Sequence, residues 1–192
     1  AGAAELDMRT SIQPERLKDC VVEDGVLRLP EPLPYQHNGD AIVLEAEDCR
    51  SLQRQNERGG SVRAPKASGG RGIAFVSEAV YHFAVRRPGD YTYWQRVWIP
   101  RKAYWVHSVQ VDDRPPMRMR FGTRKEDEAK VWFWIRGKRV HLDAGVHSLA
   151  VRNLHNGKRL DRLVLAPEED WHPEGAGPPT TPLESVDEGR FV

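Results

Sequence analysis

The stretch YTYWQRVWI, residues 91–99, decides the fold class, because its side chains alternate in character along an extended chain. In such a chain Tyr93 and Val97 lie on one face, and Trp94 and Trp98 lie on the other. Aromatic and β-branched residues repeating with this period are typical of a β-strand packed on both sides. Residues 91–99 are therefore predicted to form a strand with these two faces.

Working outward from this strand, short segments of the same kind alternate with turn signals such as RPGD at 87–90 and NG at 156–157. No amphipathic pattern long enough for a substantial helix interrupts them. Many short strands with turns between them are typical of antiparallel sandwiches and barrels. We predict an all-β, antiparallel β-sandwich. Its expected strands are 41–47, 72–76, 80–85, 91–99, 104–111, 117–121, 131–135, 139–142, 147–151 and 159–165.

The two ends differ from this pattern. Residues 1–40 read as an N-terminal appendage, with a hairpin around the Asp-Gly pair at 24–25 and a linker containing three prolines between residues 30 and 34. We expect the hairpin to pack on the sandwich. Residues 167–192 are rich in proline, glycine and acids, and form an irregular tail that wraps the domain or runs free. The sandwich domain is accordingly assigned to residues 41–166.

Composition narrows the function classes. Of the 192 residues, 39% are hydrophobic and 30% charged, and no run of 18 apolar residues predicts a membrane span. Residues 101–162 hold 15 Lys/Arg against 7 Asp/Glu, whereas residues 166–192 hold 1 Arg against 7 acids. The two cysteines, Cys20 and Cys49, are too few for a disulfide scaffold or a zinc site, and whether they form one bridge stays open.

Several segments, taken in order, resemble the carbohydrate-binding modules of families 6 and 35. The resemblance covers residues 41–166 and implies a jelly-roll sandwich, similar to galactose-binding domains. It also implies an extracellular or periplasmic, secreted protein in which the module is covalently linked to a catalytic domain that degrades polysaccharides. The segments are LEAED at 44–48, ASGG at 67–70, VYHF at 80–83, PGDY at 88–91, LDAGVHSL at 142–149 and LDRLVL at 160–165.

Three carboxylates predict a metal site. Glu45 and Glu47 stand two apart on an expected strand, so both project to one face, where they repel unless a cation or basic residue lies between them. Asp161 starts another strand and could close the site. All-oxygen coordination selects calcium over zinc, and the resemblance likewise implies a structural Ca²⁺ held by these residues. The alternative is a solvent-facing pair neutralised by Arg63 or Arg71.

A sugar site needs exposed aromatic rings, because the C–H face of a pyranose packs on a flat ring. Trp132 and Trp134 share one face of an expected strand, and Tyr104 or Trp105 could form an opposing wall. The alternative for each tryptophan is a place in the core. If the site lies elsewhere, the Trp94–Arg96–Trp98 face is the next candidate.

Polar groups beside the rings would fix the hydroxyls. His155 and Asn156 lie in the expected turn at 153–157, and an exposed Asn offers both a donor and an acceptor. Lys158 and Arg159 follow, and we expect them to form a cationic rim that favours an acidic glycan over a neutral one.

The sequence thus predicts a non-catalytic module that targets an attached enzyme to a polysaccharide or oligosaccharide. No Gly-x-Ser-x-Gly, His-Glu-x-x-His or phosphate-loop motif points to catalysis. Two rival interpretations remain: a lyase-like, polysaccharide-active enzyme on a sandwich fold, and an adhesion or protein-interaction sandwich. Nucleic-acid binding is the weakest interpretation, because the tail is acidic and no nucleic-acid motif is present. Neither nucleic acid nor membrane is expected as a partner.

Overall fold

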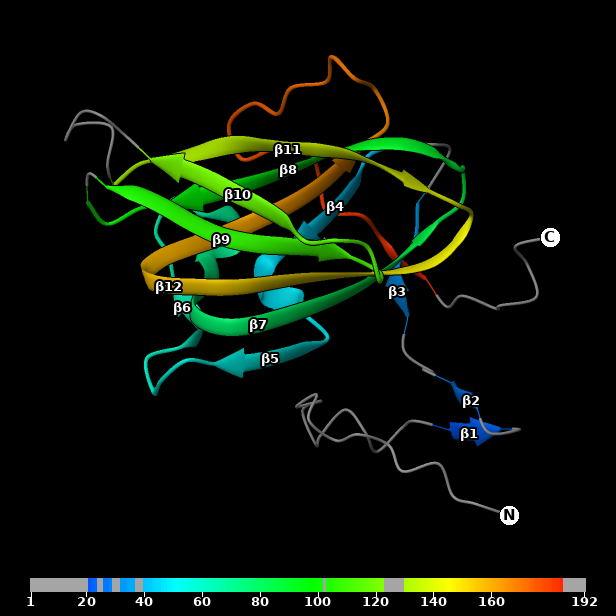
Figure 1. The fold of residues 1–192 in the computed structure, drawn as a ribbon, viewed down its shortest axis with the longest axis horizontal. Coiled ribbons are helices and arrows are strands. Elements are labelled where there is room, and N and C mark those ends of the chain that lie inside the picture. Colours follow the sequence, from blue (N-terminus) through cyan, green and yellow to red (C-terminus); the bar gives the residue numbers. More distant parts are fainter. Residues whose placement is uncertain are drawn as a thin grey trace.

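Strands account for nearly all the regular structure in the computed structural model, which describes residues 21–23, 26–28, 32–36, 40–101, 103–122 and 130–184 (Figure 1). The helices among these residues are two three-residue 3₁₀ turns, and none of the described helices has the length or apolarity to cross a membrane. The elements are β1 (Val21–Glu23), β2 (Val26–Arg28), β3 (Leu33–Pro34), β4 (Ile42–Glu45), η2 (Ala46–Asp48), β5 (Ser51–Arg54), β6 (Gly60–Arg63), η3 (Ser68–Gly70), β7 (Arg71–Val85), β8 (Gly89–Trp98), β9 (Tyr104–Val111), β10 (Met117–Gly122), β11 (Trp132–Leu142), β12 (Gly145–Ala166) and β13 (Leu183–Glu184).

The predicted antiparallel sandwich is confirmed. One layer has the strand order β10-β9-β12-β7-β5, and the other contains β11, β8, the second half of β12 and β4. The long strand β12 takes part in both layers: residues 145–154 pair with β7 and β9, and residues 159–166 pair mainly with β8 and β4. The two layers enclose one hydrophobic core, which includes Tyr91, Tyr93 and Val97 as the alternation in β8 predicts.

Three expected breaks between strands lie inside single strands. The pairing of β12 with β7 shifts register between Leu154 and Arg159, so the expected strands at 147–151 and 159–165 are one strand. Asn153, Asn156 and Gly157 have φ values of 64°, 63° and 80° there, which is why the sequence carries turn residues. Likewise β7 unites the expected strands at 72–76 and 80–85, and β11 unites those at 131–135 and 139–142.

Both ends of the described chain return to the sandwich. Residues 167–182 lie against the outer face of the β11–β8–β12–β4 layer, where Trp171 packs on the cluster of Val43, Trp94 and Val164. The tail then continues into β13, which pairs with β3. Of the two alternatives for the tail, the wrapping one is therefore correct for residues 167–184.

The N-terminal features are described in part. β1 and β2 form the predicted antiparallel hairpin, with Val22 opposite Leu27, and its packing on the sandwich stays a prediction. Cys49 is buried, whereas Cys20 lies outside the described residues, so the bridge between them also stays open.

Candidate functional site

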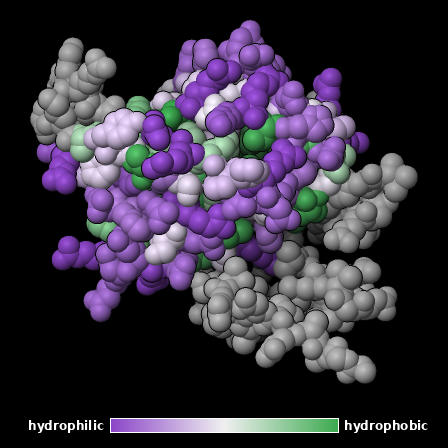
Figure 2. Space-filling model, viewed as in Figure 1, coloured by the Kyte–Doolittle hydropathy of each residue, from purple (hydrophilic) through white to green (hydrophobic). Residues whose placement is uncertain are grey.

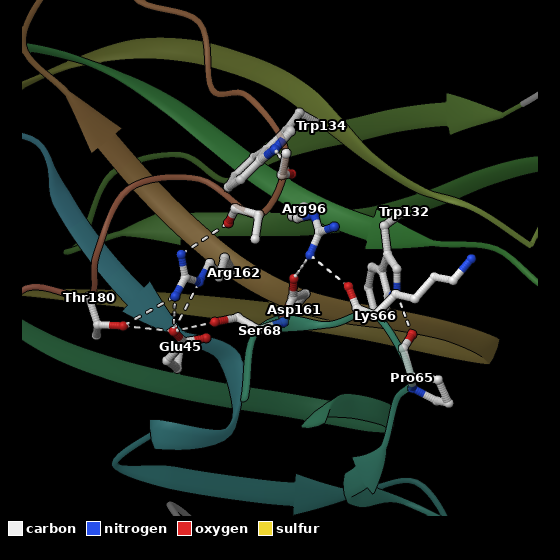
Figure 3. Close-up of polar contacts among 12 residues, drawn as sticks. Glu45, Pro65, Lys66, Ser68, Arg96, Trp132, Trp134, Asp161, Arg162 and Thr180 are labelled. Atoms are coloured by element: carbon white, nitrogen blue, oxygen red, sulfur yellow. Dashed lines mark hydrogen bonds and ion pairs between the residues drawn. The ribbon is translucent and has the colours of Figure 1, made fainter. Parts of the chain in front are cut away.

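Two of the three predicted carboxylates, Glu45 and Asp161, meet at Ser68 in the turn η3 (Figure 3), and the third, Glu47, is near enough for their charges to act on it. The Ser68 backbone N–H donates to Asp161 Oδ1 at 2.9 Å, and its hydroxyl donates to Glu45 Oε1 at 3.0 Å. Glu45 ends β4, but Glu47 lies in the 3₁₀ turn η2. The sequence pattern had placed both glutamates on one strand, and this prediction is wrong. The carboxylates are thus brought together by a turn and two strands and not by one strand face.

Two arginines neutralise this cluster. Arg162 lies opposite Glu45 in the β4–β12 pair, and its Nε donates to Glu45 Oε1 at 2.9 Å, with a second bond from Nη2. Arg96 reaches from β8, and its Nη1 donates to Asp161 Oδ2 at 2.5 Å. Asp161 is completely buried, and 8% of Arg96 and 7% of Arg162 are exposed.

Arg63 and Arg71, the partners that the sequence alternative named, lie elsewhere. Arg63 is exposed on β6, and Arg71 Nε donates to Ser61 Oγ at 3.0 Å. The alternation along β8 and β12 places Arg96 and Arg162 on the outer face. They lie beside Asp161 and Glu45 because of the register between the strands, which the sequence does not reveal.

Burial and charge set the protonation of the cluster. Burial raises the pKa of Glu47 to about 7, and the negative charges of Glu45, Asp48 and Asp161 add to the effect. Burial also acts to raise the pKa of Glu45, but hydrogen bonds from Arg162, Thr180 and Ser68 outweigh it and leave that pKa below its ordinary value.

The cluster fits a cation in part. Glu45 Oε2 and Glu47 Oε2 are buried, and neither has a hydrogen-bond partner within the described chain, so both could bind a metal ion. Both oxygens of Asp161 are already bonded, one to Ser68 and one to Arg96. Among the described residues no three His, Cys, Asp or Glu side chains are gathered as a metal site. Calcium bound by Glu45, Glu47 and Asp161 stays a prediction, with the two glutamates the better-fitting ligands.

Trp132 and Trp134 lie on the outer face of β11, and each donates its indole N–H to another segment of the chain. Trp132 Nε1 bonds to Pro65 O at 3.0 Å, and Trp134 Nε1 bonds to Gly175 O at 3.1 Å. Trp134 packs on the outer-face cluster beneath the tail, as does Trp94. Most of the Trp94–Arg96–Trp98 face is therefore occupied by the protein itself, and only its Trp98 end lies towards the loops.

The predicted opposing wall divides into an exposed and a buried residue. The Tyr104 side chain is prominent at the start of β9, with 70% of the residue exposed, whereas Trp105 is only 5% exposed and belongs to the core. Of these two residues, only Tyr104 can offer a ring to a ligand.

Lys158 is buried and links two strands by hydrogen bonds, so it is not the rim cation that the sequence predicted. Its Nζ donates to Val106 O at 2.6 Å and to Asn153 O at 3.1 Å, which joins the start of β9 to the irregular stretch of β12. Its charge lies 6.0 Å from the centroid of the Trp105 ring. Burial lowers the Lys158 pKa to about 8. Because Lys158 binds both segments, Tyr104 and Asn156 are held at the same end of the sandwich.

Arg159, the second of the two predicted rim cations, packs on Trp98. Its guanidinium lies 4.6 Å from the centroid of the Trp98 ring, and Trp98 is opposite both Arg159 and Trp132 in the strand register. Trp132, Trp98 and Arg159 thus form a row across β11, β8 and β12. The sequence named each of these residues but could not show that they are neighbours.

The turn residues complete this end of the sandwich. Asn156 is exposed at a φ of 63°. His155 is half-buried, and burial, followed by the charge of Lys158, lowers its pKa. We call Tyr104, Trp98, Trp132, Asn156 and Arg159 the loop-end site. The face of the molecule seen in Figure 2 is mostly hydrophilic, with small apolar patches between polar side chains.

Comparison with known proteins bears on the fold. No family model and no curated protein sequence matches the chain. Solved structures do match: a family 35 carbohydrate-binding module from Clostridium thermocellum is 20% identical, with a TM-score of 0.52, and the match covers 65% of this chain and 97% of that one. At this identity the likeness shows the fold alone, which is that of the family 35 module.

Two larger enzymes contain a similar part. The Podospora anserina GH26-CBM35 β-(1,4)-mannanase matches with 14% identity and a TM-score of 0.55, over 71% of this chain and 29% of that one. An exo-β-1,3-galactanase from Phanerochaete chrysosporium, bound to galactose, matches with 14% identity and a TM-score of 0.53, over 73% and 30%. The chain therefore spans less than a third of the length of these enzymes.

Proposed function

We propose that the chain is a non-catalytic carbohydrate-binding module whose loop-end site binds a polysaccharide. One observation carries the proposal: Tyr104, 70% exposed, stands at the same end of the sandwich as Asn156 and the Trp98–Arg159 pair. An exposed ring beside an amide and a guanidinium is the combination that packs on a sugar face and fixes its hydroxyls.

The ligand is an acidic glycan. The guanidinium of Arg159 lies at the loop-end site, and residues 101–162 contain 15 Lys/Arg against 7 Asp/Glu. A guanidinium binds a carboxylate or sulfate through charge-assisted hydrogen bonds, which a neutral sugar does not form. Because Lys158 is buried, the preference for an acidic over a neutral glycan depends on Arg159.

We further infer that the module is linked to a polysaccharide-degrading enzyme and acts outside the cytoplasm, in an extracellular or periplasmic setting. Large polysaccharides lie there, and the similar folds of the mannanase and the galactanase are parts of longer enzymes. A structural calcium at Glu45 and Glu47 belongs to the same proposal.

Affinity electrophoresis against a panel of neutral and acidic polysaccharides tests the function. The parent protein should be retarded by at least one acidic polysaccharide, and Tyr104→Ala should lose that retardation. Thr92→Ser, a change in the sheet away from the loops, is the matched control. Incubation with the best ligand should release neither reducing ends nor unsaturated products. Turnover that disappears with a point substitution would favour the lyase-like enzyme, and no retardation by any glycan would favour an adhesion domain.

A further inference from the structure

Two lysines outside the predicted rim lie beside the aromatic row of the loop-end site. Trp132 Nε1 donates to Pro65 O at 3.0 Å, so the segment that carries Lys66 is tied to this indole. Lys130 precedes Trp132 by two residues, and its backbone N–H donates to Ile99 O at 2.9 Å, just past the end of β8. Each lysine therefore comes from a segment that is bonded to the Trp132 end of the row.

Both lysines occupy turn positions that keep their side chains in solvent. Lys66 has a φ of 66° and Lys130 a φ of 62°, in the left-handed region that non-glycine residues adopt mainly in turns. Both residues are exposed. Figure 3 shows the Lys66 side chain extending away from the buried pair of Arg96 and Asp161, and the bond to Arg96 uses only the Lys66 backbone oxygen. The backbone thus holds each lysine in place while its ammonium group faces water.

The charges of these lysines are not paired within the described part of the chain. Lys66, Lys130 and Arg159 take part in none of its ion pairs, which involve cations such as Arg96, Arg139, Arg152 and Arg162. Arg159 instead lies over the Trp98 ring. The two indoles of the row are therefore flanked by three cations, and no acid of the described residues forms an ion pair with any of the three.

The three cations are spread along the row and are not gathered at one point. Trp132, Trp98 and Arg159 are cross-strand neighbours on β11, β8 and β12. Adjacent strands lie about 4.8 Å apart, so the row spans about 10 Å from backbone to backbone. Arg159 stands at one end, and both lysines belong to the other. Charges separated by about a Debye length are largely screened, so one negative group pairs with one end only.

We propose that Lys66 and Lys130 make the loop-end site selective for polyanionic glycans, in which negative groups recur along the chain. This inference rests on the proposed function, because it concerns the same site, and it adds how many charges the ligand carries. Arg159 binds one carboxylate or sulfate through paired hydrogen bonds, and the lysines act as point charges on a further negative group. Uronate polymers and sulfated polymers both offer such groups. A glycan with one acidic unit pairs with Arg159 alone.

The first test changes the charge of the ligand on a constant backbone. Isothermal titration calorimetry on the full chain compares polygalacturonate with its methyl-esterified form, and dextran sulfate with dextran. At least one polyanion should bind, which also tells carboxylate from sulfate, and its affinity should fall by about tenfold or more in the uncharged counterpart. Equal binding of the uncharged counterpart would overturn the inference. So would equal binding of a duplex DNA, which is a polyanion without a pyranose face to pack on Tyr104.

The second test removes the lysine charges one at a time. Lys66→Gln and Lys130→Gln should each weaken the bound polyanion several-fold. Each should also reduce the slope of log affinity against log salt by about one ion, because one fewer counterion is released on binding. Lys138→Gln removes the same charge from an exposed residue in the middle of β11 and should change neither quantity.

Tyr104→Ala separates this inference from the proposed function. It should weaken binding of the polyanion and leave the salt slope unchanged, because it removes a ring and no charge. If Tyr104→Ala weakens binding while Lys66→Gln and Lys130→Gln behave like Lys138→Gln, the proposed function stands and the inference is wrong. If Tyr104→Ala leaves binding intact, or none of the four glycans binds, the proposed function fails and the inference fails with it.

Discussion

The Arg96 guanidinium lies 2.5 Å from the Asp161 carboxylate, with 9% of one side chain and none of the other exposed. Arg162 and Glu45 form a second pair alongside it, and Ser68 bonds to a carboxylate of each. The attraction within such buried pairs offsets the cost of removing their charges from water. Removing one partner leaves that cost uncompensated.

Arg96→Leu should therefore lower the free energy of unfolding by about 3–5 kcal/mol. The double variant Arg96→Leu/Asp161→Leu should recover more than half of the loss, because no charge remains buried alone. Urea denaturation followed by circular dichroism measures both, and Arg118→Leu on the exposed face of β10 is the control, with an expected change within about 0.5 kcal/mol. Equal destabilisation in the single and double variants would show that the pair is not the cause.

Calcium should raise the melting temperature if Glu45 and Glu47 bind it. A metal that binds only the folded state stabilises it by mass action, by about 3 kcal/mol at a concentration 100 times its Kd. Chelator should lower the melting temperature, and Glu47→Ala should remove that sensitivity while Asp143→Ala keeps it. An unchanged melting curve in excess chelator, together with no metal by elemental analysis, would count against the site.

The buried His107 should make the free energy of unfolding fall at acid pH. Its Nε2 lies 2.9 Å from Gln95 Oε1, an atom that can only accept, so Nε2 carries the proton. Nδ1 is buried without a partner among the described residues, so a second proton there would have no acceptor. Burial, with a smaller contribution from the charge of Lys158, lowers the His107 pKa from 6.5 to about 3.

The unfolded chain takes up a proton at His107 below pH 6.5, and the folded protein does so only near pH 3. The stability contribution is thus complete above pH 6.5 and is lost as the pH falls towards 3, by a few kcal/mol in order of magnitude. His107→Gln keeps a donor to Gln95 but cannot titrate. The free energy of unfolding should consequently fall less steeply between pH 6.5 and 4 in this variant, and parallel profiles would contradict the assignment.

Glycan binding should depend on the rings of the loop-end site and not on Trp134, which packs beneath the tail. Tyr104→Ala and Trp132→Ala should each weaken binding by about 1–3 kcal/mol, and Asn156→Ala by about 1 kcal/mol. Trp134→Ala should instead reduce stability, because this ring packs beneath the tail. Raised salt should weaken binding of an acidic glycan and leave a neutral one nearly unchanged. Isothermal titration calorimetry checks each value, and normal binding by both ring variants would place the site elsewhere.

Local alternation was enough to predict β4, the strands from β7 to β12 and the inward face of β8, because Tyr93 and Val97 alternate with Trp94 and Trp98 whatever the partner strands are. It missed β5 and β6. The pairing of Arg162 with Glu45 was not predictable, because cross-strand register depends on the whole topology. The burial of Lys158 was missed for the same reason, whereas a place in the core was the stated alternative for Trp105. The tail carries no strand pattern over 167–182, so its docking on the outer face left little signal in the sequence.

Gly177 gives the last prediction, because it holds the tail against Trp134. Its φ is +89°, and a Cβ built there would lie 2.8 Å from Trp134 Cζ2. Gly177→Ala therefore adds both backbone strain and a clash with the indole. Gly175 is a matched control, since its φ is +53° but a Cβ there meets nothing within 4 Å. Both variants incur the strain, of the order of 1 kcal/mol, and only Gly177→Ala incurs the clash. We expect Gly177→Ala to lower the free energy of unfolding more than Gly175→Ala and to expose the tail to limited proteolysis. Equal values for the two variants, with equal cleavage, would mean that the tail does not depend on its contact with Trp134.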